Sequence, residues 1–187
     1  LGIKATLLDR ALTANLALFR SDITDQQVSR TVSATQIYID NAGETRAEGL
    51  DFEFVMRPSR RLTLTASGTY QKAKFRKYQS GAISYKGNRQ LRSPDFAGYF
   101  AIDYMMPLGD FGDLTLHGDY SERAKQFYDL ANTQLPGLYS PAYGIGNLRA
   151  TLAPSALPIR ISAFVKNVGN KQYYQNIAAN GQSGLAV

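Results

Sequence analysis

The sequence contains no cysteine, no tryptophan and a single histidine among its 187 residues. Without cysteine the chain can form neither disulfides nor thiolate-ligated metal sites, and His117 alone cannot supply the ligands of a zinc site. We therefore expect no metal and no cofactor. A run of 18 or more apolar residues is also missing, which excludes a membrane-spanning helix. A membrane β-barrel stays possible, because its alternating strands give weak hydropathy signals.

Acidic residues are fewer than basic ones, 15 against 21, and the formal net charge is +6. Such an excess favours anionic partners, although the position of the charges matters more than their sum. Hydrophobic residues make up 44% and charged residues 19%, which is not a disordered composition. The chain begins with "LGIKATLL", which resembles a strand, and has no signal-peptide pattern. We expect it to be a piece of a longer protein whose start has been removed.

Apolar and polar residues alternate along most of the chain. In "EGLDFEFVMRPSRRLTLTASGTY", residues 48–70, Leu50, Phe52 and Phe54 fall on one face of an extended chain, and the pattern resumes after a break at 58–61. Two such runs joined by a short turn predict an antiparallel hairpin. Further alternating runs cover 12–18, 96–106, 114–120, 148–152 and 159–165. Together with the opening run, the pattern predicts eight strands, a short ninth at 181–187, and no helix of useful length.

The connections between these strands alternate in length. Short ones are predicted near 8–11, 58–61, 107–112 and 153–157, and long ones near 25–43, 71–91 and 122–141. Outer-membrane barrels have short turns on one side and long loops on the other, and their strands of about 10 residues cross the membrane at a tilt. Aromatic residues near the strand ends, Tyr70, Phe96, Tyr104 and Tyr120, suit interfacial girdles. We therefore predict an all-β fold, a partial antiparallel up-and-down transmembrane β-barrel with lipid on its apolar face.

Four stretches carry a resemblance to a known family. They are "NAGETRAEGLDFEFVMRP", "LTLTASGTYQKAKF", "GNRQLRSPDFAGYFAIDY" and "ISAFVKNVGNKQYYQN". In this order they resemble the C-terminal β-barrel of TonB-dependent outer-membrane receptors, in particular those for ferric siderophores. The resemblance covers nearly the whole chain.

The resemblance implies a location and a role. Residues 1–187 would form the C-terminal part of a barrel of roughly 22 strands, with the plug domain and the final strand absent. The protein would sit in the bacterial outer membrane as a multi-pass receptor, with its long loops outside the cell. It would import a scarce ligand, a ferric siderophore first, with TonB acting through the plug. Its other contacts would be outer-membrane lipid and lipopolysaccharide; no nucleic acid is expected.

Two alternatives remain at this stage. A passive porin or small outer-membrane barrel shares every feature except the ordered family stretches. A soluble ligand-binding β-barrel or sandwich predicts instead that the apolar face points into a protein core. The residues that test this prediction are Leu16, Phe52, Leu64, Ile102 and Leu116.

The strongest candidate for ligand recognition is the segment 71–92, which holds seven basic residues and no acidic one. Cations attract anionic ligands, while aromatic side chains pack planar groups such as catecholates or stack with arginine. Contact with lipopolysaccharide phosphates, or simple solvation of a loop, would use the same residues. A second candidate is the segment 122–141. The predicted ligand-binding residues are Lys72, Lys74, Arg76, Lys77, Tyr78, Tyr85, Lys86, Arg89, Arg123 and Tyr128; Arg92, Phe75, Lys125, Phe127 and Tyr139 lie in the same segments.

Catalysis is not expected. His117, Asp119 and Ser121 share one strand face, but residues two apart on a strand are separated by about 6.5–7 Å, which we take as too far for a hydrogen-bonded triad. Asp51 and Glu53 also share a face, where we expect contacts to a plug or to Arg and Lys on neighbouring strands rather than a glycosidase pair.

Overall fold

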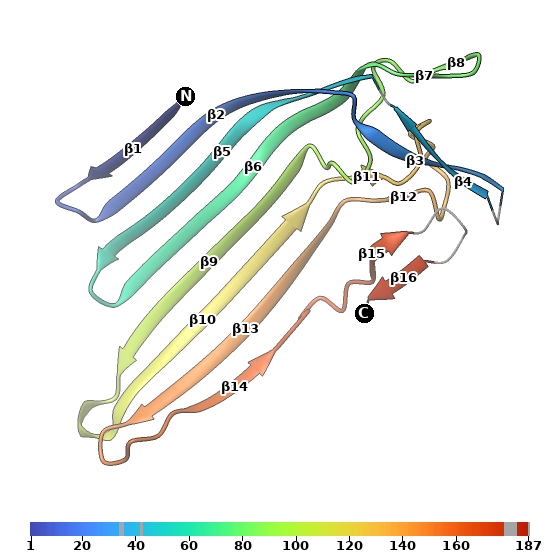
Figure 1. The fold of residues 1–187 in the computed structure, drawn as a ribbon. Helices are drawn as coiled ribbons and strands as arrows, with labels where there is room; N and C mark the ends of the chain where they lie inside the picture. Colours follow the sequence, from blue (N-terminus) through green and yellow to red (C-terminus); the bar gives the residue numbers. More distant parts are fainter. Residues whose placement is uncertain (34–35, 42, 178–182, 187) are drawn as a thin grey trace.

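Eight strands form one curved antiparallel sheet in the order β1-β2-β5-β6-β9-β10-β13-β14 (Figure 1). The structure is a computed structural model that describes residues 1–33, 36–41, 43–177 and 183–186. The strands of the main sheet are β1 (Gly2–Leu7), β2 (Leu12–Thr24), β5 (Glu44–Ser59), β6 (Leu62–Lys77), β9 (Phe96–Pro107), β10 (Gly112–Arg123), β13 (Tyr143–Pro154) and β14 (Ile161–Val165). This confirms the predicted all-β, antiparallel fold and its eight strands.

The register places apolar residues beside apolar residues across the whole sheet. Phe52 lies opposite Leu16 on β2 and Gly68 on β6, and Ala66 lies opposite Phe54 and Phe100. We call this side of the sheet the apolar face. The other side, the polar face, carries Asn15, Glu53, Ser67, Tyr99 and Ser121 in register with one another. Because side chains alternate along a strand, the sequence pattern and this register specify the same two faces.

The apolar face is open. Leu16 is 38% exposed, Leu116 is 40% exposed and Ile102 is 47% exposed. The soluble alternative required these side chains to point into a protein core, and that prediction is wrong. The fully buried aromatic residues lie instead near one end of the sheet, where Phe75 and Tyr78 pack with Leu130.

All long connections leave the same end of the sheet. The connection after β2 contains β3 (Gln27–Ser33) and β4 (Gln36–Asn41), the one after β6 contains β7 (Gln79–Ser80) and β8 (Ile83–Ser84), and the one after β10 contains β11 (Gln126–Phe127) and β12 (Tyr139–Ser140). The short connections lie at the opposite end, one of them with a three-residue 3-10 turn at Gly109–Phe111. In the part of the chain that the structure describes, no helix could cross a membrane.

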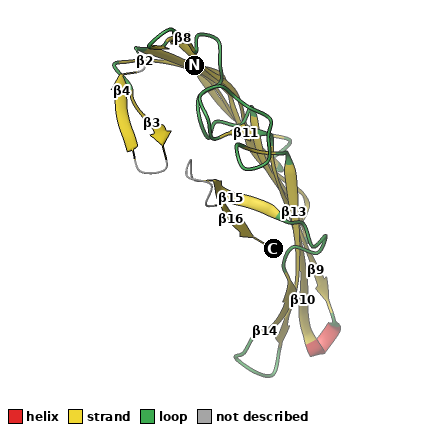
Figure 2. Cartoon of the chain, turned by 90° about the vertical axis from the view of Figure 1, so that its right-hand side faces the viewer, coloured by secondary structure: helices red, strands yellow, loops and turns green. Residues whose placement is uncertain are grey.

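Two predicted boundaries were wrong. The segment 25–43, expected as a loop, contains the hairpin β3–β4, and β6 continues to Lys77 although the loop was expected from residue 71. The predicted ninth strand corresponds to β16 (Ser183–Ala186), which pairs with β15 (Tyr173–Ile177) rather than with the main sheet; residues 181, 182 and 187 of that prediction lie outside the described residues. Figure 2 shows β3–β4 and β15–β16 standing off the same side of the sheet.

The sheet is not closed. Strands β1 and β14 are its two edges, and no pairing joins them within the described ranges. A closed barrel of eight strands would pair its first strand with its last, so the arrangement gives the small-barrel alternative no support.

Candidate functional site

The continuation of β6 places several of the predicted binding residues on the outer side of the sheet, away from the others. Beyond Tyr70 on the apolar face, the next side chains on the same side are Lys72 and Lys74, which are exposed. The intervening Ala73 and Phe75 are only 4% and 1% exposed and belong to the polar-face side. Lys72 and Lys74 therefore point away from the loops that follow them, and the exposed Arg76 comes next, at the register shift between β5 and β6. We call these three residues the outer basic row.

The buried residues of the second segment hold two long connections together. The Phe75 and Tyr85 rings each lie 5.2 Å from the Tyr78 ring, and Leu130 completes the cluster from the connection after β10. Tyr78, predicted as a ligand contact, is only 4% exposed. In this structure Tyr78 and Tyr85 fasten the segment 78–95 against the segment 124–142; a role of either ring in ligand contact stays a prediction.

Polar contacts reinforce this junction. The Asn88 side-chain amide donates to the Leu130 carbonyl oxygen at 2.8 Å, and the backbone N–H of Arg89 donates to Asn132 Oδ1 at 2.6 Å. The backbone N–H of Arg92 donates to the Phe127 carbonyl oxygen at 2.9 Å. The two connections thus form one body, and their basic side chains are brought together by it.

Cations lie against aromatic rings at this junction. The Arg89 guanidinium lies 5.8 Å from the centre of the Phe127 ring and pairs with Asp95, and Lys125 Nζ lies 5.6 Å from the same ring. The Arg92 guanidinium lies 5.9 Å from the centre of the Tyr128 ring. These distances are within the range of cation–π attraction. We call Arg89, Arg92, Arg123, Lys125, Phe127 and Tyr128 the loop cluster.

Tyr128 is held as a neutral phenol. It is 8% exposed, and its hydroxyl accepts a hydrogen bond of 2.6 Å from the Gln126 side-chain amide. Burial raises the pKa of Tyr128, and the Gln126 hydrogen bond opposes the rise. Arg92 and Arg123 also act electrostatically on this phenol, which places both guanidinium groups near it.

Arg123 extends the loop cluster to the polar face of the sheet. It ends β10 in register with Ala97 and Tyr143, and it borders a hollow of about 290 Å³ whose lining includes Thr69 and Tyr99. Tyr143 stacks on Tyr173 of β15 at 4.6 Å, so the β15–β16 hairpin covers the same side.

Lys77 and Lys86 belong neither to the outer basic row nor to the loop cluster. Lys77 Nζ pairs with Glu44 Oε1 at 2.5 Å, and both lysines line a second hollow of about 500 Å³ together with Arg76. The structure therefore does not bring the ten predicted binding residues to one place: it divides them among the loop cluster, the outer basic row, this hollow and the aromatic cluster of Tyr78 and Tyr85.

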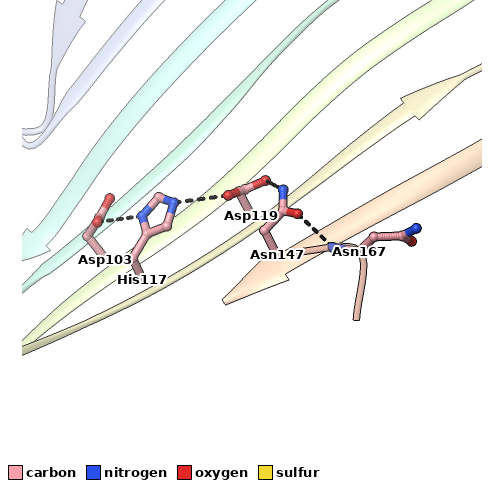
Figure 3. A network of polar contacts seen from close by, with 5 residues as sticks. All are labelled: Asp103, His117, Asp119, Asn147 and Asn167. Atoms are coloured by element: carbon pink, nitrogen blue, oxygen red, sulfur yellow. Dashed lines mark hydrogen bonds and ion pairs between the residues drawn. The ribbon is translucent and has the colours of Figure 1, made fainter. Parts of the chain in front are cut away.

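A polar network crosses the middle of the polar face (Figure 3). His117 Nδ1 lies 2.7 Å from Asp103 Oδ1, and His117 Nε2 lies 3.2 Å from Asp119 Oδ1. Asn147 donates to the second Asp119 oxygen at 2.7 Å and accepts from the Asn167 backbone N–H at 2.9 Å. The spacing argument against a His–Asp contact was wrong, because the two side chains lean together although their Cα atoms stand apart.

The network nevertheless lacks the parts of a triad. Both ring nitrogens of His117 face carboxylates, and among the described hydrogen bonds none joins His117 to Ser121 or to any other hydroxyl. Asp51 accepts from the Thr69 hydroxyl at 2.6 Å and Glu53 accepts from the Asn15 amide at 2.9 Å. These partners lie on neighbouring strands as expected, but they are neutral rather than the predicted Arg and Lys. No group of acidic or histidine residues suited to a metal occurs in the described part of the chain.

Comparison with known proteins identifies the sheet. A family model described as "TonB dependent receptor-like, beta-barrel" matches residues 1–168. The metal-pseudopaline receptor CntO of Pseudomonas aeruginosa is 27% identical over 176 residues, which cover 93% of this chain and 23% of CntO. The chain therefore belongs to the TonB-dependent receptor β-barrel family, whose members are outer-membrane proteins, and the predicted family is confirmed.

Solved structures show the same fold. The siderophore receptor PiuA of Acinetobacter baumannii matches with a TM-score of 0.75 at 20% identity, covering 99% of this chain and 26% of PiuA. The ferric yersiniabactin uptake receptor FyuA of Yersinia pestis matches with a TM-score of 0.76 at 18% identity, covering 98% and 26%. The ferric citrate transporter FecA matches with a TM-score of 0.75 at 22% identity, covering 98% and 28%. The chain thus spans about a quarter of the length of these proteins.

Proposed function

We propose that this chain is the C-terminal part of the barrel of an outer-membrane receptor that takes up an anionic metal chelate of the siderophore type. TonB would act through a plug domain encoded outside this sequence. The names of the similar proteins support the ligand class, because they are receptors for metal-pseudopaline, for ferric yersiniabactin and for other siderophores, and a transporter of ferric citrate. The chain would contribute part of the barrel wall and part of the binding mouth.

The loop cluster is the observation that carries this proposal. Arg92 and Arg123 are exposed, and neither forms an ion pair with another described residue. Both lie near the buried Tyr128 phenol, with Arg89 and Lys125 against Phe127 beside them. Guanidinium groups bind carboxylate or catecholate oxygens in pairs, and the buried Phe127 and Tyr128 rings hold the neighbouring cations in place. A negatively charged metal chelate fits this combination; the chelator would hold the metal.

Transport of this kind makes and breaks no bond in the ligand. The strands would supply part of a wall whose backbone groups are paired in the complete barrel, as lipid requires, since an unpaired group there costs several kcal/mol. The long connections and the plug would capture the chelate from outside. The energised TonB system would then move the plug from the periplasmic side.

Uptake by the full-length receptor tests the proposal. Cells that express it as their sole candidate receptor would be supplied with radiolabelled metal in ferric citrate, ferric yersiniabactin or metal-loaded pseudopaline. We expect saturable uptake of at least one chelate that stops when TonB is deleted. Replacing both Arg92 and Arg123 by Gln should weaken binding at least tenfold, because each removes a charge-assisted contact of about 1.5–3 kcal/mol. The double variant Arg57→Gln, Arg60→Gln makes the same charge change at the opposite end of the sheet and should leave uptake unchanged.

Two results would contradict the proposal. Uptake that persists without TonB would indicate a passive pore. Saturable, TonB-dependent uptake with unchanged affinity in the Arg92→Gln, Arg123→Gln variant would place the binding mouth elsewhere.

A further inference from the structure

The backbone of Arg89 lies between two segments of the chain. On one side it forms an isolated antiparallel bridge with Lys74 of β6. Beside this bridge the Asn88 carbonyl oxygen accepts from β6 at 3.0 Å, and the Gln90 N–H donates to β6 at 2.9 Å. In such a bridge the middle residue directs its own N–H and carbonyl groups to the other side. Both backbone groups of Arg89 therefore need partners beyond β6.

The side-chain amide of Asn132 binds both of these groups. The Arg89 N–H donates to Asn132 Oδ1 at 2.6 Å, and Asn132 Nδ2 donates to the Arg89 carbonyl oxygen at 3.1 Å. An amide carries an acceptor and a donor side by side, so it pairs with this backbone as a neighbouring strand would. An ionised carboxylate only accepts and an ammonium group only donates, so neither could form both bonds.

Asn132 is held in place by its own turn. Its φ is 57°, in the left-handed region that asparagine adopts more readily than most residues. Its backbone N–H and its Nδ2 donate to the Asp129 carbonyl oxygen at 3.2 and 3.4 Å. The Asp129 carboxylate in turn accepts from the Thr133 N–H at 2.9 Å and from the Thr133 hydroxyl at 2.6 Å. The amide therefore reaches Arg89 from a fixed position.

Arg92 follows three residues later, in a strained backbone conformation. Its φ is 56°, which is unfavourable for a residue with a Cβ atom. Its N–H donates to the Phe127 carbonyl oxygen at 2.9 Å, and its exposed guanidinium lies 5.9 Å from the centre of the Tyr128 ring. Such strain persists only where the surroundings hold the residue, and it is concentrated at functional positions such as ligand clamps.

We propose that Asn132 is a positioning residue for chelate binding: its amide fixes the backbone of Arg89 and thereby the direction in which Arg92 presents its guanidinium. This deepens the proposed function and rests on it, because Arg92 is one of the two cations assigned to the chelate there. A guanidinium binds an anionic group through two parallel hydrogen bonds and so needs a defined orientation. A side chain whose backbone is fixed beforehand also loses less conformational freedom on binding.

Arg89 acts as the anchor of this segment. Its guanidinium pairs with Asp95 and lies 5.8 Å from the centre of the Phe127 ring. Both its side chain and its backbone are thus engaged within the junction, whereas the Arg92 guanidinium is exposed. A change at Asn132 should therefore affect the chelate through Arg92.

The variant Asn132→Gly in the full-length receptor tests the proposal. Glycine adopts a positive φ freely, so the turn keeps its backbone conformation while both bonds to Arg89 are lost. The matched control is Asn170→Gly, the same substitution at another asparagine with positive φ, 45°, in the turn after β14. Equilibrium binding and uptake are measured with radiolabelled ferric citrate, ferric yersiniabactin and metal-loaded pseudopaline. The heat-dependent gel mobility of the barrel checks folding.

The expected change is in affinity and not in the rate of transport. Arg92→Gln should weaken binding of the chelate that the wild type takes up by about tenfold, because a charge-assisted hydrogen bond is lost. Asn132→Gly should weaken it about 5- to 10-fold, since the guanidinium is still present but is no longer held in one direction. Uptake at saturating chelate should keep its wild-type rate in Asn132→Gly, and Asn170→Gly should bind like the wild type.

Double variants separate positioning from a general loosening of the loops. Added to Arg92→Gln, the Asn132→Gly substitution should weaken binding by less than about twofold, because residues that act as one unit are not additive. Added to Arg123→Gln, it should cause its full loss, because Arg123 ends β10 and does not depend on the amide of Asn132. A merely structural role of Asn132 would give the same further loss in both backgrounds.

Three results would overturn the positioning role: wild-type affinity in Asn132→Gly, an equal loss in Asn170→Gly, or the full loss of Asn132→Gly in the Arg92→Gln background. Failure of the proposed function gives a different result. If the wild type binds none of the three chelates, the proposed function fails and the positioning role fails with it. If the wild type binds and Arg92→Gln is weakened while Asn132→Gly is not, the positioning role alone fails.

Discussion

The substitution Ala66→Arg tests whether the apolar face of the sheet is the side that contacts lipid. Ala66 lies on β6 midway between Leu62 and Tyr70, in register with Phe54 and Phe100 on the apolar face. The stretch from Leu62 to Tyr70 spans about 27 Å along the strand at about 3.4 Å per residue. At a tilt of about 40° it covers about 20 Å of depth, close to the apolar band of about 25 Å in outer-membrane barrels. Ala66 is thus near the bilayer midplane.

The expected cost of Ala66→Arg is about 2–4 kcal/mol of folding free energy in lipid, the range for a cation on the lipid face at the midplane. This corresponds to a 30- to 900-fold change in the folding equilibrium constant. The matched variant is Ser67→Arg, one residue along the strand on the polar face and opposite Glu53. It should cost less than about 0.5 kcal/mol, because its side chain meets water and a carboxylate. Tyr70→Arg, at the edge of the band, should cost about 0–1 kcal/mol.

The assay is urea unfolding of the full-length receptor in lipid vesicles, followed by the heat-dependent mobility of the folded barrel on gels. The cost in folding free energy should be largest for Ala66→Arg, smaller for Tyr70→Arg and smallest for Ser67→Arg. A larger cost at Ser67 than at Ala66 would show that the apolar face is not the lipid face. Equal costs at Ala66 and Tyr70 would refute the depth assigned to the band.

Three further predictions concern the polar face and the loops. His117→Leu leaves Asp103 without this hydrogen-bond partner and should lower the free energy of unfolding by about 1–2 kcal/mol; urea titration measures it, and addition of Asp103→Asn should cost less than the sum. Phe75→Ala should weaken the loop junction by about 3–5 kcal/mol, seen as faster amide exchange in 78–95 while the main sheet is unchanged. Because burial raises the pKa of Tyr128 above its ordinary value near 10, its contribution to stability is complete below pH 10 and is lost as the pH rises through the raised pKa. Proteolysis of 124–142 against pH should show this loss, and Tyr128→Phe should abolish it; the same alkaline loss in the variant would assign it to another group.

The sequence was most informative where one rule held over a whole strand. Leu50, Phe52 and Phe54 alternate with polar residues, and the register pairs them with apolar residues of the next strands. Alternation predicts faces from local information alone, since the period of a strand is two. Strand number and the position of the long connections followed from the same pattern.

The candidate site was harder to predict because it depends on contacts between distant segments. Arg92 lies over Tyr128, and Asn88 binds the Leu130 carbonyl group, across connections that follow different strands. Nothing in the local pattern of either segment indicates its partner. The prediction that His117 and Asp119 are too far apart to interact was wrong for another reason. It used the distance between Cα atoms, whereas the reach of the two side chains determines whether they make contact.

The error at β6 has a physical cause that applies to barrel strands in general. From Tyr70 to Phe75 the alternation continues, but its polarity is reversed: Lys72 and Lys74 are on the outside and Ala73 and Phe75 on the inside. In a membrane barrel the outside of a strand is apolar within the hydrocarbon layer and polar above it, and here the inside of the upper part of β6 is covered by loops. A prediction that requires the same face of the strand to stay apolar therefore places the end of the strand at Tyr70, although backbone pairing with β5 continues to Lys77. A shift of register by one residue would turn Lys72 and Lys74 inward and Phe75 outward, so one register sets both the apolar face and the outward position of these two lysines.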